Sequence, residues 1–123
     1  MSLSFVTIGT NNLEASVEFY TKHLDFKIDK RFRVGKSSEI AVLKDESGII
    51  EFIAGDEMKV FQGEGLMLGF EVEDIQKMYD YCNSENIKIL NPPKQLNDGM
   101  KLMTVEDIHG LILEFVQFPK NDE

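Results

Sequence analysis

The sequence predicts an α+β fold made of two tandem βαβββ modules, because one pattern of residues occurs twice. Each half opens with an apolar strand-like segment, continues with an amphipathic helix-like segment, and closes with apolar residues that follow a glycine. The closing glycines, Gly48 and Gly110, are 62 residues apart, and an acid follows each within the closing segment, Glu51 and Glu114. Two equivalent modules therefore account for most of the chain.

A polar stretch bounded by Gly55 and Gly65 separates the two copies of the pattern. We expect module 1 at about 1–54, a linker at about 55–64, and module 2 at about 65–118. The length of 123 residues corresponds to a single domain of ordinary size.

In the first half, Phe5–Gly9 predicts a short strand, and Leu13, Val17 and Tyr20 form the apolar stripe of a helix. Asn11 or Asn12 is expected to cap this helix, with Asn11 and Glu14 as a capping box. The helix should stop at Asp25, and three further strands are expected at 26–32, 39–43 and 49–54.

In the second half, a strand is expected at 66–72 and a helix from the cap residue Asp74 to about Ser84. Further strands are expected at 87–90, 101–105 and 111–118. Asn91–Gly99 is expected to be a loop, because its two prolines cannot belong to a central strand. The terminal residues 121–123 are expected to fray.

The net charge of −9 argues against binding to nucleic acid or to an anionic membrane, since both would be repelled. No apolar run is long enough to span a bilayer, and no signal peptide is visible at the N-terminus. The single cysteine, Cys82, cannot form an internal disulfide, which fits a cytoplasmic location. An acidic protein also favours a cationic ligand over an anionic one.

The doubled pattern, the segment Asn11–Tyr20 and the turn Asp107–Gly110 together resemble the vicinal oxygen chelate superfamily. This superfamily includes glyoxalase I, extradiol dioxygenases and bleomycin resistance proteins. The resemblance implies that each module curls its sheet into a half-barrel and that two modules enclose a cavity, often across a homodimer. It also implies a metal site in some members, formed by a His in the first strand and a Glu in the last strand of each module.

Placed on this sequence, the two family histidine positions fall on Phe5 and Met67, and the acid positions fall on Glu51 and Glu114. Two carboxylates without imidazole are a poor donor set for Zn, Ni or Fe(II). We therefore expect no metal and no cofactor. The two histidines, His23 and His109, lie in a helix end and in a turn, outside the positions that the resemblance assigns to ligands.

Glu51 and Glu114 are the candidate catalytic residues, and with Phe5 and Met67 they are the candidate ligand-binding residues. Each glutamate alternates in phase with aliphatic neighbours, so it is expected to line a cavity, and both are expected to line the same one. Such a carboxylate serves as a general base, as a partner for a cationic group, or as the remnant of a metal site. Alternatively, both acids face water, and Phe5 and Met67 are core residues.

Two other features have structural explanations that we prefer over functional ones. Cys82 has the spacing of a core residue on a helix, and no base for a nucleophilic thiol can be placed beside it. The basic segment Lys30–Arg33 is either a solvated strand face or a contact for an anionic group of a substrate.

Three functions remain open from the sequence. We prefer a metal-free protein of the bleomycin-resistance type, which binds a small cationic or aromatic organic ligand, usually as a homodimer, and is not an enzyme. The first alternative is a metal-dependent lyase or dioxygenase of the glyoxalase type with unusual ligands, supported by Glu51 and Glu114. The second is a non-catalytic module that serves assembly.

Overall fold

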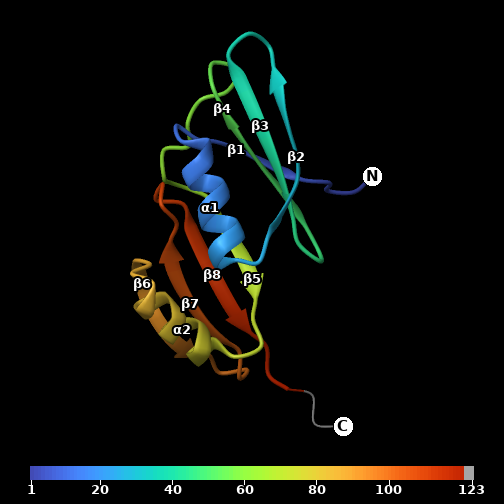
Figure 1. Cartoon of the computed structure of the whole chain (residues 1–123). Coiled ribbons are helices and arrows are strands. Elements are labelled where there is room, and N and C mark those ends of the chain that lie inside the picture. Colours follow the sequence, from blue (N-terminus) through green and yellow to red (C-terminus); the bar gives the residue numbers. More distant parts are fainter. Residues whose placement is uncertain (121–123) are drawn as a thin grey trace. The chain divides into compact units, whose positions relative to one another are not determined.

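The computed structural model describes residues 1–120, and within them the chain forms two helices and eight strands (Figure 1). The chain divides into two compact units, the first ending at Gln62 and the second beginning at Gly63. Each unit has the order βαβββ, so the predicted α+β fold of two tandem modules is confirmed. The expected fraying of 121–123 concerns residues outside the described part.

The first unit contains one mixed four-stranded sheet with the strand order β1-β4-β3-β2. Strand β1 runs parallel to β4, whereas β4 with β3 and β3 with β2 are antiparallel. The elements of this unit are β1 (Val6–Gly9), α1 (Leu13–His23), β2 (Lys27–Val34), β3 (Ser38–Lys44) and β4 (Ile49–Ala54).

The second unit repeats this arrangement with the strand order β5-β8-β7-β6, in which β5 is parallel to β8. Its elements are β5 (Met67–Glu71), α2 (Ile75–Ser84), β6 (Ile89–Gln95), β7 (Lys101–Glu106) and β8 (Ile112–Gln117). In both units the first and last strands of the module therefore lie side by side in the sheet.

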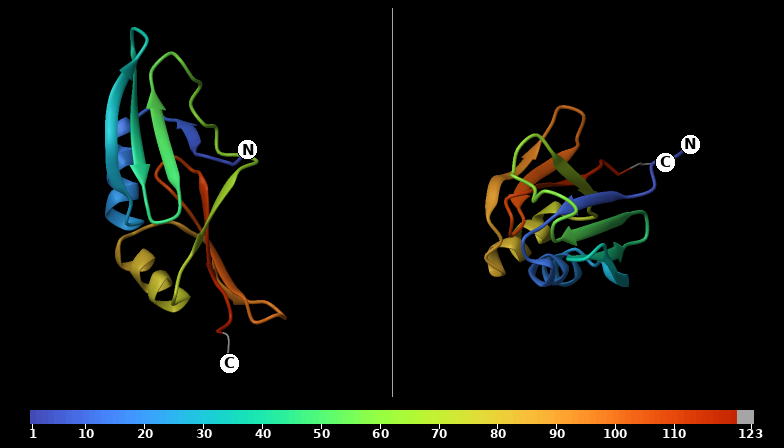
Figure 2. Two further views of the ribbon diagram at one scale, coloured as in Figure 1. Left: turned by 90° about the vertical axis from the view of Figure 1, so that its right-hand side faces the viewer. Right: turned by 90° about the horizontal axis from the view of Figure 1, so that it is seen from above.

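Each helix packs on one face of its own sheet, as Figures 1 and 2 show. In the first unit the fully buried rings of Tyr20 in α1 and Phe52 in β4 lie 4.9 Å apart between centroids. Because side chains alternate along a strand, the neighbours of Phe52, including Glu51, point to the other face. The corresponding buried residue of β8 is Phe115, and Glu114 precedes it.

The start of α1 differs in one detail from the expected capping box. Asn12 is the cap, and its side-chain oxygen accepts a hydrogen bond of 3.0 Å from the backbone N–H of Ala15. Glu14 does not return to the Asn11 backbone but binds the guanidinium of Arg31 in β2. This hydrogen bond and the charge of Arg31 lower the pKa of Glu14. A long-range ion pair thus replaces the local hydrogen bond that a capping box would form.

The expected loop at Asn91–Gly99 is wrong in its first half, because β6 extends to Gln95 and contains Pro92 and Pro93. Strand β6 is at the edge of its sheet, and its register to β7 shifts between Asn91 and Lys94. The two prolines occupy this irregular step, where no regular ladder hydrogen bond is required of them. The rule against proline applies to central strands, and the sequence did not reveal that this strand is an edge.

The chain returns across the end of β1 after β4. The backbone N–H of Phe61 donates a hydrogen bond of 3.0 Å to the carbonyl of Gly9. A Cβ on Gly9 would collide with the backbone carbonyl of Lys59. Gly9 is therefore required for the close approach of this returning segment, whereas a Cβ on Gly69 in β5 would meet no atom.

The close approach at Gly9 predicts a stability difference between two glycine variants. Gly9→Ala should lower the free energy of unfolding by about 2 kcal/mol, because backbone atoms on both sides must move. Gly69→Ala should be neutral or slightly stabilising, because its methyl group enters open space. Urea denaturation followed by circular dichroism measures both, and equal stabilities of the two variants would contradict the packing at Gly9.

Candidate functional site

We call the face of each sheet that its own helix leaves uncovered the open face. Each open face carries one of the two acids that recur in the repeat. On the open face of the first unit, Glu51 of β4 lies between Thr7 of β1 and Val42 of β3 in the strand register. On the open face of the second unit, Glu114 of β8 lies between Gly69 and Thr104. The repeat thus places each acid at an equivalent position of its sheet.

Glu51 is held by a hydrogen bond from the strand beside it. The hydroxyl of Thr7 donates to Glu51 Oε1 over 2.6 Å, and both residues are half-buried. A hydrogen bond to a carboxylate is stronger than one between neutral groups, so it fixes the side chain of Glu51 on the open face. Thr7 was not among the predicted site residues, although it is two residues from Phe5 and so has the same phase along the strand.

Apolar side chains surround Glu51 on the same face. Ile40, Val42 and Ile53 form a buried cluster, and Val34 and Ile49 pack against it. The carboxylate therefore stands at the border of an apolar surface, as the alternation with Ile49 and Ile53 predicted. Such a border suits a ligand that has both an apolar part and a polar group.

The open face of the second unit is more polar. Thr104, which is buried, accepts a hydrogen bond of 2.7 Å from the side-chain amide of Asn91. Glu114 lies next to Thr104 in the register and is half-buried, with Ile112 and Val116 on the same face. Asn91 was not among the predicted site residues, because its neighbouring prolines predicted a loop and not strand β6.

Phe5 and Met67 are not core residues, because 50% of Phe5 and 49% of Met67 is exposed. Phe5 directly precedes β1, and Met67 opens β5 with Ile112 as its register partner. Met67 therefore shares the open face with Glu114. Both side chains are therefore accessible to a ligand. The alternative that they are core residues is wrong.

The donor set does not fit the metal site that the superfamily resemblance implies. Among the described residues, no group of three or more His, Cys, Asp and Glu side chains is arranged to hold a metal ion. His23 lies at the end of α1 with its ring 5.0 Å from that of Phe19, and the backbone N–H of His109 donates to the side chain of Asp107. Phe5 and Met67 stand where imidazole ligands are expected.

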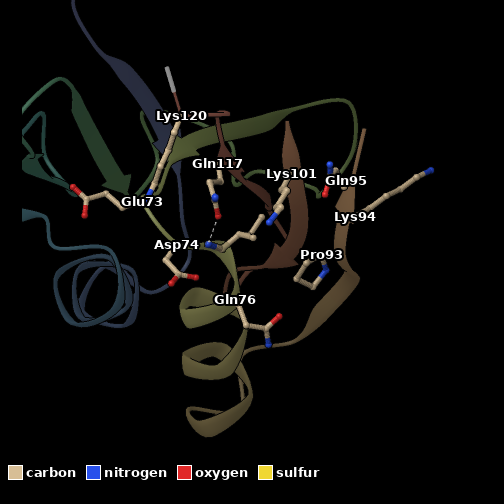
Figure 3. A pocket seen from close by; sticks show the side chains of 10 residues that line it. Glu73, Asp74, Gln76, Pro93, Lys94, Gln95, Lys101, Gln117 and Lys120 are labelled. Atoms are coloured by element: carbon tan, nitrogen blue, oxygen red, sulfur yellow. Dashed lines mark hydrogen bonds between the residues drawn. The ribbon is translucent and has the colours of Figure 1, made fainter. Parts of the chain in front are cut away.

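A separate pocket of about 420 Å³ lies in the second unit at the start of α2 (Figure 3). None of the four predicted site residues lines it; its lining is Glu73–Gln76, Pro93–Gln95, Lys101, Gln117 and Lys120. The backbone N–H of Ile75 donates to Gln117 Oε1 over 2.9 Å, and that of Lys77 to Asp74 Oδ1 over 3.1 Å. The helix start is thus already hydrogen-bonded within the protein.

The basic segment is divided between the two faces of the first sheet. Arg31 lies on the helix side, where it binds Glu14 and, over 3.1 Å, Glu39. Lys30 is the register partner of Val42 and therefore lies on the open face together with Glu51. All four residues of this segment are exposed, and Lys30 lies on the same face of the sheet as Glu51.

The comparisons with known proteins agree with this architecture. Residues 2–115 match the family described as the Glyoxalase/Bleomycin resistance protein/Dioxygenase superfamily, and the chain belongs to this family. Among curated proteins, YraH of Bacillus subtilis (strain 168) is 28% identical over 101 residues, which cover 76% of this chain and 79% of YraH.

Solved structures show the same fold. A glyoxylase/bleomycin resistance protein/dioxygenase domain from Frankia sp. EAN1pec superposes with a TM-score of 0.79 at 21% identity, covering 97% of this chain and 98% of the other. A glyoxalase family protein from Enterococcus faecalis superposes with a TM-score of 0.78 at 25% identity, covering 94% and 96%. No helix among residues 1–120 is long and apolar enough to cross a membrane.

The hydrogen bond between Thr7 and Glu51 predicts a measurable contribution to stability. Thr7→Val keeps the shape of the side chain and removes the donor, so it should lower the free energy of unfolding by about 1 kcal/mol. Thr7→Ser keeps the donor and should recover most of that loss. Chemical denaturation of the three proteins at neutral pH provides the test, and a Val variant as stable as the Ser variant would argue against the bond.

Cys82 is fully buried in α2, and this burial raises the pKa of its thiol to about 11. The folded state therefore keeps the proton where the unfolded state, with a pKa near 9.0, releases it. The protonated thiol of Cys82 therefore contributes to the stability of the folded state in full below pH 9. This contribution is lost as the pH rises towards 11. This thiol is a poor nucleophile at neutral pH.

We expect the free energy of unfolding to fall between pH 9 and 11, and to fall less in Cys82→Ala than in the unaltered protein. Denaturation curves at several pH values give the slope of the free energy of unfolding against pH for each protein. The titration of all other groups contributes equally to both slopes, so their difference reports Cys82. In parallel, a thiol reagent at pH 8 should label Cys82 only after denaturation. Rapid labelling of the folded protein would show that the side chain is accessible.

Proposed function

We propose that this protein binds small organic molecules, without a catalytic metal, on its open faces, of which the first carries Glu51 and the second carries Glu114. This is the binding mode of the bleomycin-resistance type within its family. The main support is the composition of the site: each half-buried glutamate is retained, whereas Phe5 and Met67 stand in place of the imidazoles that a metal requires.

The chemistry of the open face indicates the kind of ligand. In the first unit, the partly buried side chains of Val34 and Ile49, which pack against the buried aliphatic cluster, provide apolar surface for a ring or chain. Glu51 provides a negative charge at its border, oriented by Thr7. A cationic or aromatic organic compound matches this combination, and the net charge of −9 favours the approach of a cation.

Assembly as a homodimer and a cytoplasmic location are further parts of this proposal. The dimer is supported by the family resemblance, and the location by the free, buried thiol of Cys82. Nucleic acid and anionic membranes are not proposed as partners, because the acidic chain repels both.

The proposal predicts that organic ligands, and not metal ions, stabilise the protein. In a thermal-shift screen of cationic glycopeptides and aromatic metabolites, at least one compound should raise the melting temperature by several degrees. Glu51→Gln should weaken binding of a cationic hit about tenfold, because the charge at the site is lost. Glu46→Gln, which removes the same charge from the exposed turn before β4, should leave binding unchanged.

Metal analysis of the purified protein separates this function from the lyase or dioxygenase alternative. We expect far less than one equivalent of Zn, Ni, Mn or Fe per chain. A stoichiometric metal that is lost in Glu51→Ala or Glu114→Ala would overturn the proposal in favour of the metal-dependent alternative. A complete absence of stabilising compounds would instead favour the assembly alternative.

A further inference from the structure

A cation and a carboxylate face the same side of the first sheet across one intervening strand. The register joins Lys30 of β2 to Val42 of β3, and Val42 to Glu51 of β4. Neighbouring strands lie about 4.8 Å apart, so the backbones of Lys30 and Glu51 are about 10 Å apart. Both side chains project from the open face, because Arg31 and Phe52 project from the helix side.

The charge of Lys30 is available to a ligand. Its ammonium group lies 5.7 Å from the centre of the Phe32 ring, and it forms no ion pair with any residue among 1–120. Lys44, which shares the open face, is different because it pairs with Asp29 over 3.4 Å. Lys30 is exposed at the edge strand, where an anionic group can reach it.

Only one of the two carboxylate oxygens of Glu51 is available to a ligand. Its Oε1 accepts the hydrogen bond from Thr7, and no described residue donates to its Oε2. Between Lys30 and Glu51 lies the buried side chain of Val42, which continues into the apolar cluster with Ile40 and Ile53. The row therefore has a cation at one end, a buried aliphatic side chain in the middle and a carboxylate oxygen at the other end.

The row at the equivalent positions of the second unit lacks this pattern. It consists of Asn91, Thr104 and Glu114, so a neutral amide replaces the cation and a hydroxyl replaces the apolar middle. The amide is also engaged in its hydrogen bond to Thr104. The two equivalent rows are therefore chemically different, and only the row of the first unit carries opposite charges. On the second open face a cation, Lys94, lies in another row, as the register partner of Leu102.

We propose that the open face of the first unit selects zwitterionic ligands, with an anionic group at Lys30, a cationic group at Glu51 and an apolar body over Val42. This inference rests on the proposed ligand-binding function and specifies its ligand class. The two charges of such a ligand are separated by a distance on the order of 10 Å, set by the two strand spacings. A ligand with a single charge gains from only one of the two contacts.

A tripeptide with free ends is a suitable probe, since three extended residues span about 10 Å between the terminal charges. We would use Ala-Phe-Ala, its N-acetylated form, which lacks the cation, and its C-terminal amide, which lacks the anion. In calorimetric titrations the free tripeptide should bind about three to five times more tightly than the amide. It should bind about ten times more tightly than the acetylated form.

Matched variants assign each preference to its residue. Lys30→Ala should abolish the preference for the free peptide over the amide and keep the preference over the acetylated form. Glu51→Gln should have the opposite effect. Arg33→Ala removes the same charge from the same strand, but its register partner is Glu39 on the helix side. It should change neither preference.

Equal affinities for the three peptides would overturn the inference, as would a loss of discrimination in Arg33→Ala as large as that in Lys30→Ala. No binding of any peptide would also overturn it. The proposed function would then be judged by the aromatic and cationic compounds of the thermal-shift screen, which do not need Lys30. Circular dichroism of each variant, together with Lys30→Gln as a second substitution, distinguishes lost recognition from lost folding.

Discussion

Most features of this protein depend on one constraint, which is that each sheet has a single helix to cover it. The apolar side chains of one phase of the strands, such as Phe52 and Leu43, are buried against that helix. Strand alternation then sends the other phase to the opposite face, whatever its chemistry. Glu51 and Glu114 lie on this second face because they precede Phe52 and Phe115. The same geometry that builds the core therefore sets the position of the acids.

The two modules share this architecture but differ in the residues that surround each acid. The first surrounds its acid with an aliphatic cluster and fixes it through Thr7, whereas the second has Gly69 and Thr104 at the register positions beside its acid. Phe5 and Met67, to which the superfamily resemblance assigns the imidazole positions, are both half-exposed. A shared scaffold thus carries two surfaces of unequal polarity, which is consistent with a fold that hosts several chemistries.

The sequence was a good guide wherever local periodicity or the repeat decided the structure. The repeat predicted βαβββ twice, and alternation put Glu51 in phase with Ile49 and Ile53. It was a poor guide where partners are distant. Glu14 has the spacing of a capping box, yet it binds Arg31 seventeen residues away. Pro92 and Pro93 read as a loop until β6 is known to be an edge strand with an irregular register.

The sequence by itself determined the number of modules and the phase of the strands that carry Glu51 and Glu114, because these depend on residue type and short spacing. Only the tertiary structure decided which side chains meet across strands. Lys30, Val42, Glu51 and Thr7 come from four strands, and they form one row because of the order and register of those strands. Register arises from the packing of the whole sheet, so no local pattern in the chain reports it.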